Sequence, residues 1–260
     1  MTHKDIQIEL RGQHKEVAVV RMTRAAKRNA LNDALIASLR QLFEQMPASV
    51  RAAVIDGDGE HFCAGLDLSE LKERDAGQGL HHSRSWHAAL DRVQSGPVPV
   101  IAALHGAVVG GGLELASACH IRVADESTFY ALPEGSRGIF VGGGGSVRIP
   151  KLVGVARMTD MMLTGRVYNA VDGEKAGFAQ YLVPAGQAFD KAFELAQRVA
   201  QNAPLTNYAL MHALPRIAEQ SADHGFFTEA MMAAIAQSAP EAKERVKAFL
   251  DGKAAKVKKA

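Results

Sequence analysis

The sequence predicts an α/β core followed by a helical C-terminal region. Short apolar segments alternate with helical patterns up to about residue 186, and only helical patterns follow. The chain has 260 residues, of which 47% are hydrophobic, enough for a large core that needs no disulfides. We therefore expect an α/β core over residues 1–186 and a helical region over residues 187–260.

The first elements are predicted from periodicity. Alternating apolar residues predict a β-hairpin with strands at 6–10 and 17–20. An apolar stripe at helical spacing then predicts a helix that Asn32 or Asp33 caps. The apolar run 52–55 predicts a buried strand, and the sequence DGDG that follows it predicts a turn.

The middle of the chain is predicted to contain a loop and a second buried strand. Residues 72–85 are polar and include two glycines, which predicts a mobile loop, and residues 85–94 form a helical pattern. The apolar run 100–104 predicts a buried strand, and residues 146–152 a helix.

From Ala188 onward the pattern is helical throughout. A first helix carries apolar residues at helical spacing, and three further helical segments follow at about 204–220, 223–237 and 241–255. Pro215 is expected to kink or break the first of these three segments, since proline removes a helical hydrogen bond.

Composition bears on the class of protein. Lys and Arg number 30 against 28 Asp and Glu, a balance that does not suggest a dedicated nucleic-acid binder. Neither a signal core near the N-terminus nor an apolar run of ~18 residues is present in the sequence. Cys63 and Cys119 lack metal-ligand spacing and fit reduced thiols. We expect a cytoplasmic protein with no metal site and no membrane or nucleic-acid partner.

The stretch 99–133 carries the first candidate site. Its short apolar run is followed by the glycines 110–112 and then by an apolar helical pattern that contains Glu114. A strand, a glycine bend and a helix N-terminus leave backbone N–H groups free at the positive end of the helix dipole. The same bend also fits a tight packing turn with no ligand, and the residues alone leave both interpretations open.

Two further motifs carry candidate chemistry. The sequence HFCAGLDL at 61–68 places small residues after a strand, where backbone N–H groups stay uncovered. The sequence LPE at 132–134 precedes glycines at 135, 138 and 142–145. Taken singly, the first motif also fits an ordinary turn, and the second fits a surface glutamate.

The glycines give little support to nucleotide binding. Gly142 and Gly144 are followed by Val147 where a dinucleotide fingerprint needs glycine, and no phosphate-binding loop motif occurs. Cys63 has no identifiable catalytic partners in the sequence.

Together the motifs resemble the crotonase, or enoyl-CoA hydratase/isomerase, superfamily over nearly the whole chain. The matching segments are KRNALN at 27–32, FCAGLDL at 62–68, PVIAALHGAVVGGGLELASACHIRVAD at 99–125, PEG at 133–135, LTGR at 163–166 and EAKERVKAFL at 241–250. The resemblance implies a crotonase-like fold of repeated β-β-α units, with C-terminal helices that build a homotrimer or a dimer of trimers.

The resemblance also implies roles for individual residues. Ala64 and Gly111 match the backbone donors of an oxyanion hole, and Glu114 and Glu134 match the two glutamates of the hydratase members. The positions implied to bind coenzyme A are Ala26, Lys27, Arg28, Gly65, Leu66, Asp67 and Leu68. The coenzyme A thioester is then the substrate, and no separate cofactor is implied.

The expected function is hydration of a trans-2-enoyl-CoA, with Glu114 activating water and Glu134 exchanging a proton at Cα. Double-bond isomerisation and hydroxycinnamoyl-CoA hydration with retro-aldol cleavage are alternatives on the same scaffold, and Trp86 and Phe140 fit either an aromatic acyl pocket or core packing. A non-catalytic acyl-CoA-binding or RNA-binding protein is a further alternative.

Two positions and one segment depart from the family pattern. His120 stands where the family usually has Asp. Val257 stands where many members carry an aromatic residue that closes over coenzyme A, although Lys258 remains. The segment 138–148 has more glycine than is usual.

Overall fold

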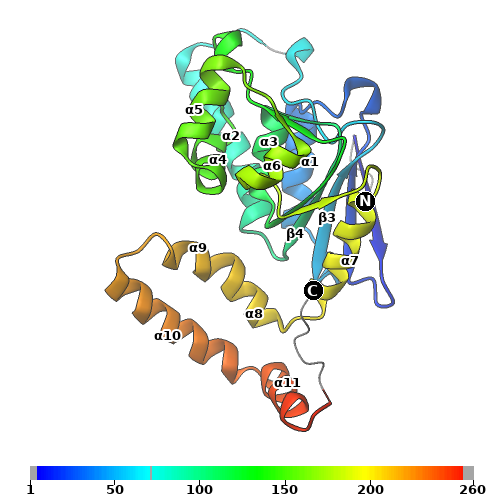
Figure 1. Cartoon of the computed structure of the whole chain (residues 1–260), viewed down its shortest axis with the longest axis vertical. Helices are drawn as coiled ribbons and strands as arrows, with labels where there is room; N and C mark the ends of the chain where they lie inside the picture. Colours follow the sequence, from blue (N-terminus) through cyan, green and yellow to red (C-terminus); the bar gives the residue numbers. More distant parts are fainter. Residues whose placement is uncertain (1–4, 71, 254–260) are drawn as a thin grey trace. The chain divides into compact units, whose positions relative to one another are not determined.

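A six-stranded sheet forms the centre of the first of two units in the computed structural model, which describes residues 5–70 and 72–253 (Figure 1). Its order is β1-β2-β3-β4-β6-β9; β1 and β2 are antiparallel and each later pair is parallel. The strands are β1 (Ile6–Arg11), β2 (Val17–Met22), β3 (Ala52–Gly57), β4 (Val100–Leu104), β6 (Ile121–Asp125) and β9 (Tyr181–Val183). The predicted hairpin and both predicted buried strands are confirmed.

A second, three-stranded sheet has the order β5-β7-β8. Its strands are β5 (Ala107–Val109), β7 (Phe129–Ala131) and β8 (Tyr168–Asn169). β5 follows β4 after a short turn and leads directly into the glycines of the candidate site. The small sheet therefore fixes where those glycines begin.

Alternation along the strands gives the large sheet two apolar faces. Ala53 and Ile55 of β3 belong to one core cluster, whereas Ala52 and Val54 belong to another. The first cluster includes residues of α1, α2, α3 and α4, and the second is completed by α7 (Figure 1). Helices thus cover both faces, as expected for a mostly parallel sheet.

The helices of the first unit follow the predicted order. They are α1 (Asp33–Glu44), α2 (Ala76–Gln94), α3 (Gly111–Ala118), α4 (Gly145–Val153), α5 (Val155–Thr164), α6 (Ala170–Ala176) and α7 (Ala188–Ala200), with the short 3-10 helices η1 (Ala25–Lys27), η2 (Leu68–Glu70) and η3 (Gly135–Arg137). Asn32 caps α1, because its side chain accepts a hydrogen bond from the N–H of Leu35 at 2.9 Å.

The loop predicted over 72–85 is wrong for most of its length, since α2 begins at Ala76. Asp75 and Gln78 form a capping box: the Asp75 side chain accepts from the Gln78 N–H at 2.8 Å, and the Gln78 side chain accepts from the Asp75 N–H at 3.2 Å. This local signal outweighs the helix-weakening effect of the two glycines.

The second unit is helical. It contains α8 (Pro204–Tyr208), the π-helical segment η4 (Ala209–Ala213), α9 (Leu214–Ile217), α10 (Ala222–Ser238) and α11 (Pro240–Leu250). The π-helical turn immediately precedes α9, which contains Pro215, so the expected distortion takes this form. α10 runs back alongside the preceding helices (Figure 1).

The two units divide between Ala200 and Gln201, whereas the sequence placed the boundary between residues 186 and 187. The difference arises because α7 buries Ala192 and Ala196 against the large sheet and so belongs with the core. Within residues 5–70 and 72–253, no helix is long and apolar enough to cross a membrane.

Replacement of Gly79 by alanine tests the extent of α2. Gly79 lies inside the helix, and a Cβ there would have no neighbour within 4 Å. Alanine is the better helix former, so we expect Gly79→Ala to raise the free energy of unfolding by about 0.5–1 kcal/mol in urea denaturation.

The matched control is Gly186→Ala, which also adds a Cβ with no neighbour within 4 Å but at a φ of +79°. We expect a loss of about 1 kcal/mol there, because alanine is strained in that conformation. Equal effects at both positions would contradict a helical Gly79.

Candidate active site

The turn at Gly110 brings the N-terminus of α3 against Glu134. β5 ends at Val109, and Gly110 turns the chain into α3 with a φ of +51°. A Cβ on Gly110 would lie 2.7 Å from Oε1 of Glu134. Glycine is therefore required both for the turn and for the space that the Glu134 carboxyl group occupies.

The structure corrects one of the two predicted backbone donors. The N–H of Ala64 donates a hydrogen bond to the carbonyl oxygen of Arg28 at 2.9 Å, so it is committed to the protein backbone. Leu66, two residues further on, pairs with Leu31 in an isolated parallel bridge. That bridge uses the carbonyl of Gly65 and the N–H of Asp67, which leaves the N–H of Leu66 outside the pairing.

Leu66 and Gly111 together provide two neighbouring backbone donors. The nitrogen of Leu66 lies 3.5 Å from the position that a Cβ on Gly111 would take. Among residues 5–70 and 72–253, neither the Leu66 N–H nor the Gly111 N–H has a hydrogen-bond acceptor. Gly111 is also the first residue of α3, where the helix dipole adds positive potential. The pair is therefore suited to bind an oxygen that carries negative charge.

The Glu114 carboxyl group is buried and held by a glycine segment, Gly142–Gly145. Its side chain projects from the first turn of α3, and its Oε1 accepts hydrogen bonds from the N–H groups of Gly143 and Gly145, both at 2.8 Å. A Cβ on Gly145 would lie 2.7 Å from Cγ of Glu114, so the segment approaches this closely only as glycine. Oε2 is left for other partners.

Burial raises the pKa of Glu114 above its ordinary value, and the two glycine N–H groups oppose that rise. Burial also raises the pKa of Glu134, and the negative charge of Glu114 raises it further. Oε2 of Glu134 is buried and has no hydrogen-bond partner among the described residues. Protonation of Glu134 removes both the cost of burying its charge and the repulsion from Glu114. The site therefore favours an ionised Glu114 beside a protonated Glu134.

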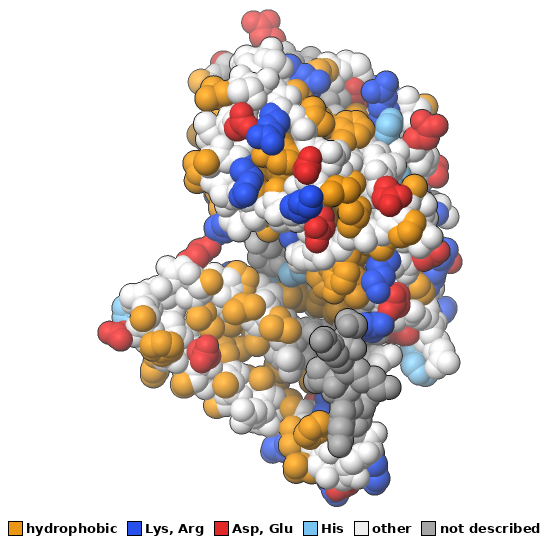
Figure 2. Space-filling model, viewed as in Figure 1, with side chains coloured by type: hydrophobic (Ala, Val, Ile, Leu, Met, Phe, Trp, Pro, Cys, Tyr) orange, Lys and Arg blue, Asp and Glu red, His pale blue; other side chains and the backbone are white. Residues whose placement is uncertain are grey.

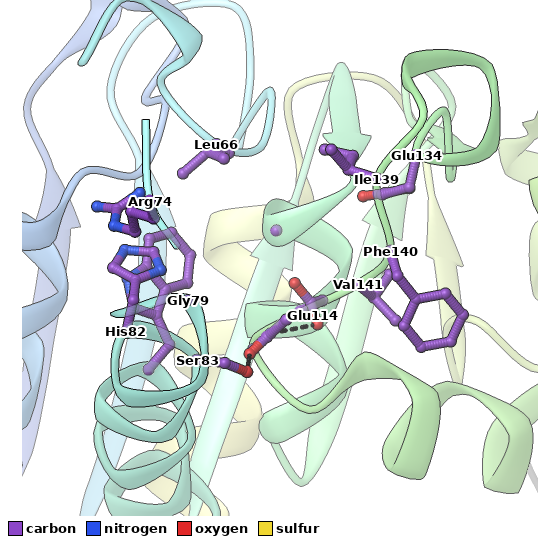
Figure 3. Close-up of a pocket in the computed structure, with 14 residues that line it drawn as sticks. Leu66, Arg74, Gly79, His82, Ser83, Glu114, Glu134, Ile139, Phe140 and Val141 are labelled. Atoms are coloured by element: carbon purple, nitrogen blue, oxygen red, sulfur yellow. Dashed lines mark hydrogen bonds between the residues drawn. The ribbon is translucent and has the colours of Figure 1, made fainter. Parts of the chain in front are cut away.

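Both carboxyl groups reach one cavity of about 400 Å³. In Figure 3, Arg74, His82 and Ser83 lie on one side of it, and Ile139, Phe140 and Val141 on the other. Leu66 and Gly111 also line it, so the cavity holds two free backbone donors and two carboxyl groups.

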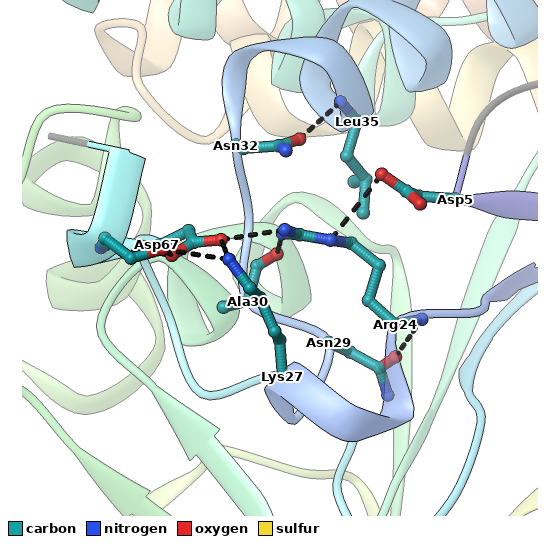
Figure 4. A network of polar contacts seen from close by, with 9 residues as sticks. Asp5, Arg24, Lys27, Asn29, Ala30, Asn32, Leu35 and Asp67 are labelled. Carbon is teal, nitrogen blue, oxygen red and sulfur yellow. Dashed lines mark hydrogen bonds and ion pairs between the residues drawn. The ribbon is translucent and has the colours of Figure 1, made fainter.

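The predicted coenzyme A-binding positions lie on two adjoining loops. Asp67 is buried; it accepts a hydrogen bond from Arg24 at 2.7 Å and one from Lys27 at 3.0 Å (Figure 4). Hydrogen bonds from Ser69, Lys27 and Arg24 hold the pKa of Asp67 well below its ordinary value. Asp67 therefore joins the two loops, and its carboxylate is already hydrogen-bonded to protein groups.

Other predicted binding positions remain at the surface. Ala26, Lys27 and Arg28 are exposed, and Leu68 is 45% exposed. Arg28 has a left-handed φ of 51°, and the buried side chain of Asn29 donates to the carbonyls of Asp58 and His61. The exposed residues thus sit on a turn that buried hydrogen bonds fix.

The aromatic candidates both line the cavity. Trp86 is 4% exposed and lies against Gly111, whereas Phe140 is 68% exposed.

Cys63 is buried, and burial raises the pKa of its thiol to about 12, which fits packing. His120 accepts a hydrogen bond from the N–H of Val100 at 3.0 Å. Val257 and Lys258 lie outside the described residues.

Sequence reasoning missed Arg74 and His82 of the cavity wall and the carboxylate that holds them. Asp33 was considered only as a helix cap, yet its Oδ1 accepts from Nε1 of Trp86 at 3.0 Å and lies 2.7 Å from Nε2 of His82. Arg74 lies 3.4 Å from the same carboxylate. His82 and Trp86 are four residues apart, a spacing that would have shown a shared face had the helix been extended to Ala76.

Known proteins resemble the chain over nearly its whole length. A family model described as enoyl-CoA hydratase/isomerase matches residues 12–259. The chain is 32% identical over 243 residues to 2,3-dehydroadipyl-CoA hydratase of Escherichia coli (strain K12), covering 92% of this chain and 93% of that protein.

Solved structures match over almost the full chain. A provisionally assigned enoyl-CoA hydratase from Rhodopseudomonas palustris is 59% identical with a TM-score of 0.93, over 96% of each chain. The enoyl-CoA hydratase of Bacillus anthracis is 30% identical with a TM-score of 0.88, over 95% of this chain and 96% of that one. These matches confirm the fold expected from the sequence.

Substitution of Asp67 by asparagine tests the loop network. The variant keeps the shape but removes the charge that Arg24 and Lys27 face, so we expect it to lower the free energy of unfolding at neutral pH by ~2–3 kcal/mol. Exposed Asp58→Asn serves as control, with a change within about 0.5 kcal/mol.

The pH dependence of that loss has a defined sign. The pKa of Asp67 is lower in the folded chain than the unfolded value of about 3.9, so its stabilisation is present above that value and is lost as pH falls through the folded pKa. The difference between parent and variant should be largest near neutral pH and shrink in acid. A constant difference would contradict the ionic role.

Proposed function

Because the chain belongs to the enoyl-CoA hydratase/isomerase family, we propose that it binds an acyl-CoA thioester and adds water syn across a trans-2-enoyl double bond. One observation carries the proposal: two free backbone N–H groups and two buried carboxyl groups line the same cavity. An acyl-CoA-binding protein without catalysis has no need of two buried carboxyl groups, whose burial costs stability.

The N–H groups of Leu66 and Gly111 are the proposed oxyanion hole. They donate to the thioester oxygen, which withdraws electrons from the conjugated double bond and makes Cβ electrophilic. As water attacks, negative charge develops on this oxygen as an enolate, and each fixed donor stabilises it by about 3 kcal/mol. Trp86 against Gly111 helps to keep bulk water away from this side of the cavity.

The two glutamates take the proton-transfer roles. Glu114 enters the reaction ionised, and its free Oε2 accepts a proton from water as the water oxygen bonds to Cβ. Glu134 enters protonated and donates its proton to Cα as the enolate collapses. The product gains one water, and a proton passes from Glu114 back to Glu134 before the next turnover. The environments of the two carboxyl groups favour this division.

Lys27 and Arg28 are proposed to contact the phosphates of coenzyme A, since both lie on an exposed turn beside the loop of Leu66.

A second candidate function is hydration followed by retro-aldol cleavage of an aromatic enoyl-CoA. It is favoured by Trp86 and Phe140, which both line the acyl cavity. Isomerisation needs only one proton-exchanging carboxylate, so the second glutamate favours hydration.

Glutamine substitutions test the proposal. We expect the parent protein to remove the conjugated-thioester absorbance of crotonyl-CoA, and Glu114→Gln and Glu134→Gln each to lower kcat at least ~100-fold while the Kd for a CoA ester stays within about 3-fold. Exposed Glu174→Gln on α6 is the matched control and should retain full turnover.

Feruloyl-CoA is assayed alongside crotonyl-CoA. Turnover of feruloyl-CoA alone, with vanillin released, would replace simple hydration by the hydratase-lyase reaction. Near-parental kcat in either glutamine variant would remove that residue from the mechanism.

We also propose that the chain assembles as a homotrimer or a dimer of trimers through its C-terminal helices. Phe226 and Phe227 of α10 are 69% and 71% exposed, and hydrophobic side chains extend over the second unit (Figure 2). A patch of this kind is typical of an interface. Light scattering should give three or six chains per particle, and a monomer at micromolar concentration would contradict the proposal.

A further inference from the structure

The glycine segment that holds Glu114 is itself held by side chains from two helices. Gly143 and Gly145 donate their N–H groups to Oε1 of Glu114, so their carbonyl groups and those of their neighbours point elsewhere. A glycine-rich segment has more conformational freedom than any other, and its amides do not keep one orientation without further contacts. Among residues 5–70 and 72–253, Ser83 contacts the segment at Gly142 and Arg148 contacts it at Gly143.

The first contact comes from Ser83 of α2. Its Oγ donates a hydrogen bond to the carbonyl oxygen of Gly142 at 2.6 Å. The two residues are 59 positions apart in the sequence, so this hydrogen bond connects the middle of α2 to the start of the glycine segment. The hydroxyl proton is committed to this carbonyl, which argues against Ser83 as a nucleophile even though Nε2 of His87 lies 3.3 Å from Oγ.

The second contact comes from Arg148 of α4. Its Nη1 donates to the carbonyl oxygen of Gly143 at 3.0 Å, and its Nε donates to Oε1 of Gln94 at 2.6 Å. Gln94 is the last residue of α2, so the guanidinium group connects α2 to the glycine segment. Gly144, at φ +97°, leaves room for it, because a Cβ there would overlap Nη1. The planar fork of arginine is what allows both bonds at once.

We propose that Ser83 and Arg148 are positioning residues that set the orientation of the Glu114 carboxyl group through the glycine segment. The inference rests on the proposed hydration, in which Oε2 of Glu114 must face water. Each residue holds a carbonyl next to an amide that binds Oε1, so loss of either contact lets that amide rotate and the carboxylate follow. A displacement near 1 Å at such a group costs about 10- to 100-fold in rate.

The first test compares Ser83→Ala with Ser85→Ala. Both serines lie on α2, but Oγ of Ser85 donates to the carbonyl of His82 within the helix and does not contact the glycine segment. We expect Ser83→Ala to lower kcat about 10-fold with KM and the CoA-ester Kd within about 3-fold, whereas Ser85→Ala keeps parental kcat. Ser83→Thr restores a hydroxyl and should recover most of the lost kcat.

The second test compares Arg148→Lys with Arg157→Lys. Arg148→Lys keeps the charge but loses the planar group that makes two hydrogen bonds, and we expect a similar loss of kcat. Arg157 of α5 bonds only the Val153 carbonyl among the described residues, and Arg157→Lys should keep full turnover.

In a Glu114→Gln background, Ser83→Ala should change the residual kcat less than 2-fold, because its effect passes through Glu114. Equal 10-fold losses in both backgrounds would overturn the proposal.

Crystal structures of the variants give a readout that does not need turnover. Loss of either contact should lengthen the Gly143 and Gly145 bonds to Glu114 or turn the carboxyl group. An unchanged Glu114 in both Ser83→Ala and Arg148→Lys would overturn the positioning role even if the parent hydrates enoyl-CoA. A moved Glu114 in a chain that shows no hydration would instead retain the positioning and reject the proposed reaction.

Discussion

The burial of the Glu114 carboxyl group is the constraint on which the rest of the site depends. An ionised carboxylate removed from water is costly unless hydrogen bonds satisfy it, and here two backbone N–H groups do so on one oxygen only. The other oxygen stays available for chemistry. The Gly145 amide is available because it lies in the first turn of α4, the Gly143 amide lies just before that helix, and glycine permits the close approach of both.

The large sheet determines where the cavity beside Glu114 forms. β4 leads through β5 to Gly110, and the turn there places Gly111 at a helix N-terminus and leaves room for Glu134. The parallel bridge between Leu31 and Leu66 directs a second N–H outward from the backbone pairing. The negative charge of Glu114 then raises the pKa of Glu134 in the shared cavity, which favours a proton on Glu134.

Much of this fold was predictable because its signals are local. Alternation along β3 and β4 marks strands buried on both faces, and the side chain of Asn32 caps α1 as the sequence suggested. The start of α2 was missed because glycines were given more weight than the Asp75–Gln78 capping box. The unit boundary was placed early because only tertiary packing shows that α7 belongs with the sheet.

The site was predictable in its residue types and less so in its backbone. Glu114, Glu134 and Gly111 follow from motifs and resemblance, and the structure brings them to one cavity. The choice between Ala64 and Leu66 depends on which N–H a parallel bridge leaves unpaired, and the register of one isolated bridge leaves no mark in composition or periodicity. Ser83 contacts the Gly142 carbonyl 59 residues away, and Arg148 joins the nearby Gly143 carbonyl to Gln94, 54 residues away, which no local pattern shows.

The most direct measurement of the central claim is the mass of the product formed from a series of trans-2-enoyl-CoA esters in ¹⁸O-labelled water. The account predicts a product heavier than its substrate by one labelled water, with the label on the Cβ hydroxyl group. Esters that bind tightly but keep their mass across the whole series, whether unchanged or isomerised, would contradict hydration at Glu114 and Glu134.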